Sequence, residues 1–328
     1  PRRRSPPGRA RPNPPVPAPW TIVCRMVGSS SSLSESRPSP WASSSRSAAP
    51  MAAFLQGASI EVMPRTAAGV SDLRDRLPAG TLVFVAHIDG TAPADMQATV
   101  ARLARDGFRP VPHVPARIVP SRAALNEWVA GYRDAGAEGA LLLGGGLSAP
   151  KGEFRDSMQL LETGLFGDFR HLFIAGHPEG NRDIDPDGGE AEVMRALRWK
   201  ADFAARTDAD MQIVTQFAFE AQPCIDWAGR LRAAGIDMPI RIGVAGPAKL
   251  QTMLKFAIMC GVGPSLRVLQ RRARDVTKLL LPYEPTDFVG ALARARQDDP
   301  DFPIAAAHVF PLGGIAASTD WLSRARGE

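Results

Sequence analysis

The chain has 328 residues, of which 45% are hydrophobic and 22% are charged, and its formal net charge is +5. This composition is ordinary for a globular protein, and the length suits one large α/β domain. The first 50 residues hold eight arginines and one acid, whereas the rest of the chain carries 31 basic and 33 acidic residues. Because the main part is close to neutral, a role in nucleic-acid binding has little electrostatic support.

The first 50 residues are rich in Pro, Arg and Ser. Such a segment buries too little apolar surface to offset the entropy lost on ordering, so we expect residues 1–50 to be a disordered extension. Its Arg/Ser bias also resembles an organellar transit peptide, although an unstructured tail or translated upstream sequence is the simpler interpretation. We therefore expect one catalytic domain over residues 51–328, with Met51 near the true start.

The cysteines and the lengths of the apolar runs indicate in which cellular compartment the protein works. The three cysteines, Cys24, Cys224 and Cys260, have no spacing typical of a zinc site or a disulfide framework. No apolar run approaches the roughly 18 residues that a membrane span needs. We therefore expect a cytoplasmic protein that binds neither a metal nor a membrane.

From Ala58 onward, short apolar runs alternate with amphipathic segments. The predicted strands are Ala58–Met63, Thr81–Ala86, Arg109–Val114, Gly139–Leu143, His171–Ala175, Gln212–Phe217, Ile240–Val244 and Ala305–Phe310. The predicted helices are Ala67–Arg76, Ala94–Arg105, Ser121–Ala135, Phe154–Thr163, Glu190–Ala205, Cys224–Ala234, Ala248–Met259 and Thr286–Arg296, with an added helix at Pro264–Asp275 and a closing one at Ser318–Arg326. Eight such repeats predict a (β/α)8 TIM barrel, with an open doubly wound sheet as the alternative.

No nucleotide-binding fingerprint follows the first strand, and Walker A, HExxH and GxSxG motifs are also missing. Polar residues do follow the strands, at the end where barrel enzymes place their active sites. Glu61 stands out because burying a carboxylate inside an apolar strand costs folding free energy, so such a residue is usually paired or functional. His87 and His113 lie at strand ends too, although a lone histidine there is more often a packing residue than a catalyst.

Later strand ends carry further candidates. Gln216 can hydrogen-bond both donors and acceptors of a heterocycle, or simply bridge two loops. Lys200 lies in an amphipathic helical segment, and that pattern alone predicts a lysine on the solvated face of the helix. The GVAGP segment at Gly243–Pro247 and the GHPEGN segment at Gly176–Asn181 place glycines where a ligand can approach the backbone.

Taken together, these motifs resemble the methylenetetrahydrofolate reductase family over nearly all of Ala58–Leu322. The resemblance rests on IEVMPR (the family's FEFFPPR), the PH of the third strand, GHPEGN (the family's YPE and a later His), LRWKAD, TQFAFE (the family's TQFFFD) and the GVAGPAKLQTMLKFAIMCGVGPSL segment. The TQF element followed by an acid is the most specific of these motifs.

The resemblance implies a (β/α)8 barrel with FAD at the strand C-termini and NADH or NADPH as co-substrate. It implies ping-pong hydride transfer that interconverts 5,10-methylenetetrahydrofolate and 5-methyltetrahydrofolate, in one-carbon metabolism and methionine biosynthesis. Glu61 matches the general acid that protonates folate N10. The positions matching cofactor contacts are His87, His113, Gly145, Gly146, His177, Glu179, Asn181 and Lys200, and those matching substrate contacts are Gln216, Phe219 and Gly246.

Two positions depart from the family pattern. The Gly-Asp after the fourth strand reads Gly145-Gly146 here, and the Tyr before Pro-Glu is His177. Both changes touch the flavin face, so two alternatives stay open: a flavin-independent folate one-carbon oxidoreductase or methyl-transfer barrel, and a folate-binding barrel without turnover. The arginine-rich Pro264–Asp275 is expected to form a solvated or subunit-contact face, which also leaves a homo-oligomer open.

Overall fold

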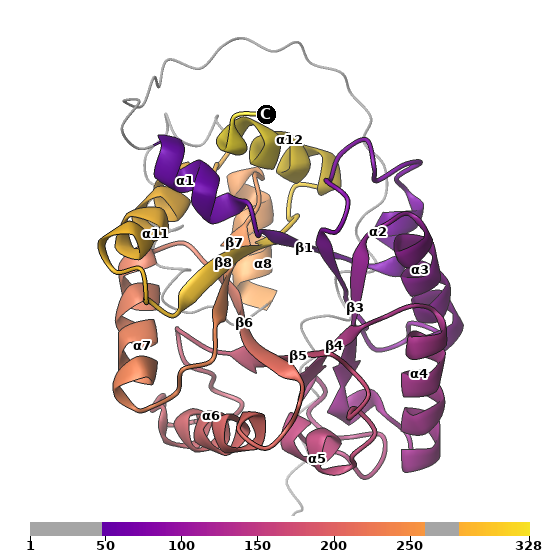
Figure 1. Cartoon of the computed structure of the whole chain (residues 1–328). Helices are drawn as coiled ribbons and strands as arrows, with labels where there is room; N and C mark the ends of the chain where they lie inside the picture. Colours follow the sequence, from indigo (N-terminus) through magenta and orange to yellow (C-terminus); the bar gives the residue numbers. More distant parts are fainter. Residues whose placement is uncertain (1–47, 260–281) are drawn as a thin grey trace, which may run out of the picture.

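Eight parallel strands form a closed barrel in the computed structural model, which describes residues 48–259 and 282–328 (Figure 1). In chain order the strands are β1 (Ser59–Val62), β2 (Leu82–Val85), β3 (Arg109–Pro115), β4 (Gly139–Leu143), β5 (His171–Gly176), β6 (Asp210–Ala218), β7 (Ile240–Ala245) and β8 (Ile304–Phe310). Each strand pairs with the next, and β8 pairs with β1. The predicted TIM barrel is confirmed, and all eight strands fall where the apolar runs placed them.

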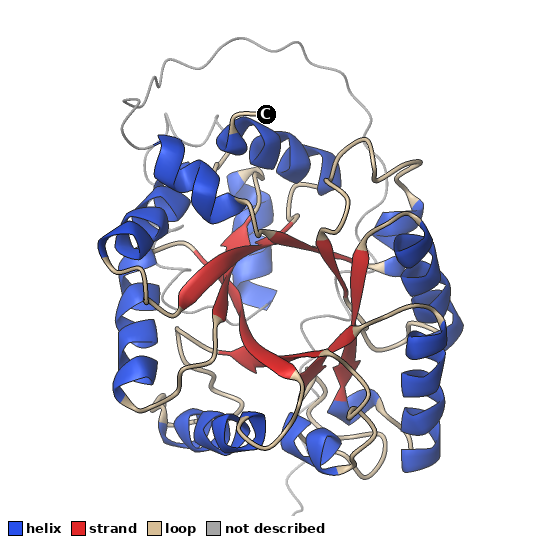
Figure 2. Cartoon of the chain, in the orientation of Figure 1, coloured by secondary structure: helices blue, strands red, loops and turns tan. Residues whose placement is uncertain are grey.

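Helices surround this barrel on the outside (Figure 2). They are α1 (Ala48–Leu55), α2 (Pro64–Ala68), α3 (Pro93–Arg105), the 3-10 turn η2 (Ala116–Ile118), α4 (Arg122–Asp134), α5 (Ser157–Glu162), α6 (Ala191–Ala204), α7 (Ala221–Ala233), α8 (Leu250–Met259), α11 (Thr286–Asp298) and α12 (Ile315–Arg326). The helix α1 was not predicted, and it packs against α11 and α12. The predicted helix at Pro264–Asp275, like Cys24 and Cys260, lies outside the described residues.

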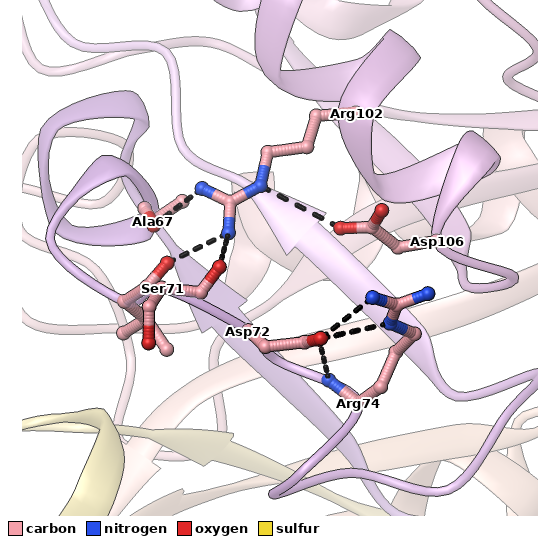
Figure 3. Close-up of polar contacts among 7 residues, drawn as sticks. Ala67, Ser71, Asp72, Arg74, Arg102 and Asp106 are labelled. Atoms are coloured by element: carbon pink, nitrogen blue, oxygen red, sulfur yellow. Dashed lines mark hydrogen bonds and ion pairs between the residues drawn. The ribbon is translucent and has the colours of Figure 1, made fainter.

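The predicted helix over Ala67–Arg76 is wrong beyond its first two residues, because α2 ends at Ala68. Arg102 of α3 donates hydrogen bonds to the carbonyls of Ala67, Val70 and Ser71 and forms an ion pair with Asp106 (Figure 3). A continued helix would use those carbonyls for its own hydrogen bonds. The tertiary contacts of one arginine therefore replace the helical ones that the local sequence favours.

Successive side chains along each strand point alternately out of and into the barrel, and they form two separate apolar cores. Side chains on the outer face pack under the helices, as Ile60 and Val62 of β1 do. The inward side chains form a smaller apolar cluster inside the barrel: Phe84, Val111, Leu141, Phe173 and Val214. The barrel interior is therefore a packed core, and the layers above and below this cluster carry its polar groups.

The N-terminal end of the barrel is closed by a polar network from four strands, which we call the basal network. Its members are Arg109, His171, Asp210, Gln212 and Arg241. Arg109 donates to Nε2 of His171 at 2.7 Å, and the Arg241 guanidinium donates to Oε1 of Gln212 at 2.9 Å and to the carbonyl of Gly57 at 2.8 Å. Each of these side chains therefore has a hydrogen-bond partner. A cavity of about 210 Å³ beside Arg109 and His171 also opens at this end.

Within the described ranges, no helix is both long and apolar enough to cross a membrane.

Candidate active site

The site forms around Glu61, the third residue of β1. Its neighbours Ile60 and Val62 pack on the outer face, so the alternation of the strand turns Glu61 into the barrel. Backbone register places it opposite Phe84 of β2. The residue is buried, and its side chain keeps 11% of its surface exposed. The sequence prediction that β1 carries a carboxylate inside an otherwise apolar strand is therefore matched by its position in the structure.

Two histidines from other strands approach the Glu61 carboxyl group. The Nε2 atom of His113 on β3 lies 3.5 Å from Oε2 of Glu61, and the Nε2 atom of His308 on β8 lies 3.7 Å from the same oxygen. These separations are longer than hydrogen bonds, and neither Nε2 atom has a hydrogen-bond partner in the described part of the chain. Unpaired buried polar atoms are rare in native proteins and need an explanation. We call these three residues the acid cluster.

The acid cluster rests on aromatic rings. The centroid of the Phe84 ring lies 4.6 Å from that of His308 and 6.2 Å from that of His113, both edge-on. Phe310 also packs edge-on against His308, with the ring centroids 4.8 Å apart. These rings form an apolar floor against the two histidines, while Glu61 and His113 each keep about a tenth of their side-chain surface exposed.

Burial sets the protonation states of the acid cluster. Desolvation raises the pKa of Glu61 above its usual 4.5, and the neighbouring His113 partly opposes that rise. Desolvation also lowers the pKa of His113 to about 4 and that of His308 to about 3. All three shifts favour the uncharged forms, as a low-dielectric site requires. A carboxylic acid that resists ionisation is suited to donate a proton.

His308 is the member of the acid cluster that the sequence reasoning missed. Its signal was present, since it is a polar residue in the apolar run AAAHVF, as Glu61 is in its own strand. Its contact with Glu61 depends on the pairing of the first strand with the last, which only closure of the barrel creates. Among the described residues, no group of three or more potential ligands has the geometry to hold a metal ion.

His87, predicted as a cofactor contact, lies buried against α4. Its ring centroid is 4.8 Å from that of Trp128, its Nδ1 is 3.4 Å from the Tyr132 hydroxyl, and its Nε2 is 3.3 Å from the carbonyl of Thr91. Desolvation lowers its pKa to about 4. These contacts pack the His87 ring against α4, and its role as a cofactor contact stays a prediction.

The loop after β5 brings together several predicted cofactor contacts. Nδ2 of Asn181 lies 3.4 Å from Nδ1 of His177, and Gly180 turns the chain with a positive φ of 75°. Gly176 is required because an added Cβ would lie 2.4 Å from the Ile213 side chain. Glu179, the third predicted cofactor contact of this loop, is half-buried.

Lys200 faces this loop from α6. The side chain is 7% exposed and has no hydrogen bond within the described part of the chain. Burial lowers its pKa to about 8, against the attraction of Asp156. Burial also lowers the pKa of His177 to about 4, and the charge of Lys200 adds to that shift. Lys200 is therefore not the solvated residue that its helix pattern alone suggested. No hydrogen bond or ion pair among the described residues joins Lys200, His177 or Asn181 to Glu61.

Gln216 lies at an irregularity in β6, where the pairing with β7 shifts between Val214 and Phe217. Its Oε1 accepts from the backbone N–H of Phe217 at 3.2 Å. An added Cβ on Gly243 of β7 would lie 2.4 Å from the Gln216 carbonyl, so glycine is needed where the two strands approach. The bulge, which the sequence did not predict, determines where the Gln216 side chain is presented.

The other two predicted substrate contacts lie near the β6–β8 edge. Phe219 is buried in an apolar cluster with Phe217 and Phe310. Gly246 donates its N–H to the carbonyl of Phe310 at 2.8 Å, and an added Cβ would lie 2.3 Å from Oγ of Ser318. Close packing therefore gives a structural reason for glycine at this position.

The Gly145-Gly146 segment follows β4 and is held by Arg117, which the sequence analysis did not single out. The Arg117 guanidinium donates to the carbonyls of Leu147 and Arg155, both at 3.0 Å, and to that of Gly145 at 3.5 Å. Gly145 has a φ of 87°. The loop therefore presents backbone and an arginine where the family pattern has a carboxylate.

Comparisons with known proteins bear on this site. No protein-family model matches the chain. Over 163 residues the chain is 28% identical to 5,10-methylenetetrahydrofolate reductase of Pectobacterium carotovorum subsp. carotovorum, and the match covers 48% of this chain and 50% of that protein. The chain therefore spans about half the length of this curated relative, and over that part the similarity supports the family resemblance.

The comparison with solved structures gives matches with low TM-scores. Triosephosphate isomerase from Bartonella henselae matches with a TM-score of 0.39 and 7% identity, over 84% of this chain and 100% of that one. Oxaloacetate acetylhydrolase bound to oxalate matches with a TM-score of 0.39 and 14% identity, over 77% and 97%. Similarity at this level carries no argument about activity.

Proposed function

We propose that this chain is an oxidoreductase resembling methylenetetrahydrofolate reductase, which interconverts 5,10-methylenetetrahydrofolate and 5-methyltetrahydrofolate with NADH or NADPH. The observation that carries the proposal is the acid cluster: a buried carboxyl group with a raised pKa, between two neutral histidines, inside a barrel. The sequence similarity to a methylenetetrahydrofolate reductase supplies the substrate class.

In this proposal Glu61 is the general acid. Its proton goes to N10 of the bound folate, the C–N bond of the five-membered ring breaks, and the resulting iminium carbon accepts a hydride. The partial exposure of Glu61 and His113, against none for His308, fits a substrate that arrives from the open side of the cluster. Gln216 would hydrogen-bond the pterin through the amide nitrogen that its backbone contact leaves available.

The residues around Lys200 fit an anionic cofactor such as the diphosphate of FAD. A buried ammonium without a hydrogen bond in the described structure favours an anion, and the Asn181 amide and the His177 ring supply further donors in the same loop. The flavin would serve as the two-electron carrier between nicotinamide and folate. On this reading Lys200 binds the cofactor phosphates, while Glu61 holds and delivers the substrate proton.

The deciding experiment is an anaerobic absorbance titration of the full chain with NADH, followed by addition of methylenetetrahydrofolate. Bands near ~450 nm that bleach with NADH and return with the folate support the proposal as stated. A protein that gives neither flavin bands nor folate-dependent NADH oxidation contradicts it.

A second candidate is direct hydride transfer from NADH to folate without flavin. The favouring observation is the loop after β4, where Gly145, Gly146 and the Arg117 clamp replace a carboxylate. A colourless protein that oxidises NADH only when methylenetetrahydrofolate is present would establish this alternative and would retain Glu61 as the acid.

A further inference from the structure

A buried serine, Ser59, contacts one member of the acid cluster, His308. The Ser59 hydroxyl lies 2.9 Å from Nδ1 of His308 and 3.4 Å from the carbonyl oxygen of Ala307. The opposite ring nitrogen, Nε2, faces Oε2 of Glu61 at 3.7 Å. Ser59 and His308 are fully buried and directly opposite each other in the β1–β8 register, so the backbone of the closed barrel fixes their contact.

The Ser59 hydroxyl has one hydrogen and two neighbouring acceptors, the Ala307 carbonyl and Nδ1 of His308, so two hydrogen-bond arrangements exist. If it is donated to Ala307, then Nδ1–H of His308 donates to the Ser59 oxygen, and Nε2 turns a lone pair toward Glu61. Across the 3.7 Å that separates the two atoms, such a lone pair favours a protonated Glu61 over its carboxylate. If the hydrogen is donated to Nδ1 instead, Nε2 carries its own hydrogen and favours the Glu61 carboxylate.

The surroundings favour the first arrangement, because it leaves no charge in the acid cluster. Phe84 and Phe310 pack on the His308 ring, and an ionised Glu61 would stand over this apolar floor with only long-range contacts. The neighbouring titratable groups also favour uncharged histidines. His113 on β3 is itself neutral through burial, and the charge of Arg241 on β7 opposes protonation of His308. His87, beyond β2, opposes protonation of His113.

We propose that Ser59 and His308 are positioning residues that keep Glu61 in its protonated form, by holding His308 as the Nδ1–H tautomer. The inference rests on the proposed function, since a proton held on Glu61 serves a reaction only if Glu61 is the acid. Once Glu61 has given its proton to the substrate nitrogen, its carboxylate faces the Nε2 lone pair. That unfavourable contact promotes return of a proton from solvent on the exposed side of Glu61.

Nitrogen NMR of the full chain tests the tautomer directly. The protein has five histidines, so selective ¹⁵N-histidine labelling gives few signals, and the His308→Gln variant identifies the one of interest. We expect Nδ1 of His308 to be protonated in the parent protein and Ser59→Ala to move the proton to Nε2. A parent protein with Nε2 protonated, or a tautomer that Ser59→Ala leaves unchanged, overturns the inference.

The pKa of Glu61 is the second readout, followed through a ¹³C label on its carboxyl carbon. Ser59→Ala should lower it by about one unit, because the new Nε2–H then faces the carboxylate and favours its charged form. The high-pH limb of folate turnover should move down by the same amount, which a merely structural defect would not produce. An unshifted Glu61 pKa in Ser59→Ala overturns the inference.

Ser318→Ala is the matched control. It removes another fully buried serine hydroxyl, one without a hydrogen-bond partner among the described residues, and it should change neither the tautomer nor the Glu61 pKa. Both NMR measurements need no turnover. A protein with the expected tautomer and pKa shift but no folate activity therefore refutes the proposed function, while the opposite result refutes only the role of Ser59 and His308.

Discussion

The two ends of the barrel interior treat their polar groups in opposite ways. In the basal network, His171 accepts from Arg109 and its other ring nitrogen lies 3.1 Å from Asp210, which also accepts from Gln212 at 3.0 Å. In the acid cluster, Nε2 of His113 and Nε2 of His308 both point at one carboxyl oxygen without a hydrogen bond. Each end holds at least one histidine and one carboxyl group, so the contrast lies in their pairing.

That contrast separates stability from chemistry. A buried polar group left unpaired destabilises a fold by about 1–3 kcal/mol, so it persists where another requirement maintains it. The acid cluster lies inside the barrel near the strand C-termini, where barrel enzymes carry out catalysis, whereas the N-terminal face serves stability. We therefore expect substitutions in the acid cluster to affect turnover, and substitutions in the basal network to affect unfolding.

The largest effect should come from Glu61→Gln, because an amide cannot deliver a proton. Folate turnover should fall about 1,000-fold, the usual contribution of a general acid, while reduction of the cofactor by NADH should persist. Stopped-flow measurement of the two half-reactions separates these outcomes. Equal loss of both would show that Glu61 is structural. Glu127→Gln makes the same change on the exposed surface of α4 and should leave both rates unaltered.

The next effect concerns the dependence of stability on pH. His113 and His308 have pKa values of about 4 and about 3 in the folded protein, against 6.5 when unfolded. Because unfolding lets both histidines bind protons below pH 6.5, their stabilising contribution is complete above that pH and is lost as pH falls toward 4. The slope for the pair is about 3 kcal/mol per pH unit.

Urea unfolding at pH 7, 6 and 5 measures the total slope, to which His87 and His177 also contribute because burial lowers their pKa values to about 4. The difference between the parent protein and a variant isolates the share of one histidine. In His308→Gln the slope should fall by about 1.4 kcal/mol per pH unit, the value for one proton. An unchanged slope would mean that His308 is protonated in the folded protein, and the assignment of a neutral acid cluster would be wrong.

Most of the fold could be predicted from the sequence because each strand–helix unit carries its own signal. The apolar runs and the amphipathic helices are local features, and closure follows from having eight of them. The local signal failed over Ala67–Arg76, since Arg102 takes the carbonyls that a helix would need. It also failed for α1, whose sequence AAPMAAFL has almost no polar face.

The site was only half predictable for a related reason. Glu61 could be identified within its own strand. Its contact with His308, however, joins the first strand to the last, and the Ser59–His308 pair joins residues 249 positions apart. The bulge that presents Gln216 comes from a register shift between β6 and β7, which neither strand reveals alone. Contacts created by closure and register were therefore the ones that the sequence could not supply.

Gly243→Ala should give the third effect, at the β6 bulge. The added Cβ would meet the Gln216 carbonyl at 2.4 Å, and backbone atoms cannot move aside as a flexible side chain can. We expect a loss of about 3 kcal/mol in unfolding free energy. We also expect a higher KM for folate, because Gln216 moves with the bulge.

Gly229→Ala is its control. This residue lies in α7 with open space around it, and alanine there should stabilise the helix by about 0.5–1 kcal/mol. Chemical unfolding and steady-state kinetics on both variants check the pair. A Gly243→Ala protein as stable as its parent would mean that the strands do not approach as closely as described.

The smallest effect should come from Gln212→Met, and it tests the basal network directly. Gln212 donates to Asp210 and accepts from Arg241, so methionine keeps the volume but removes both bonds and leaves the buried part of Arg241 short of an acceptor. Unfolding free energy should fall by about 1–2 kcal/mol, while kcat and KM for folate stay unchanged. Gln222→Met, which removes an exposed i,i+4 bond to Asp226, should lower stability by less than about 0.5 kcal/mol. A Gln212→Met protein with normal stability and impaired turnover would reverse the roles of the two ends, because paired groups at the base would then be serving the reaction.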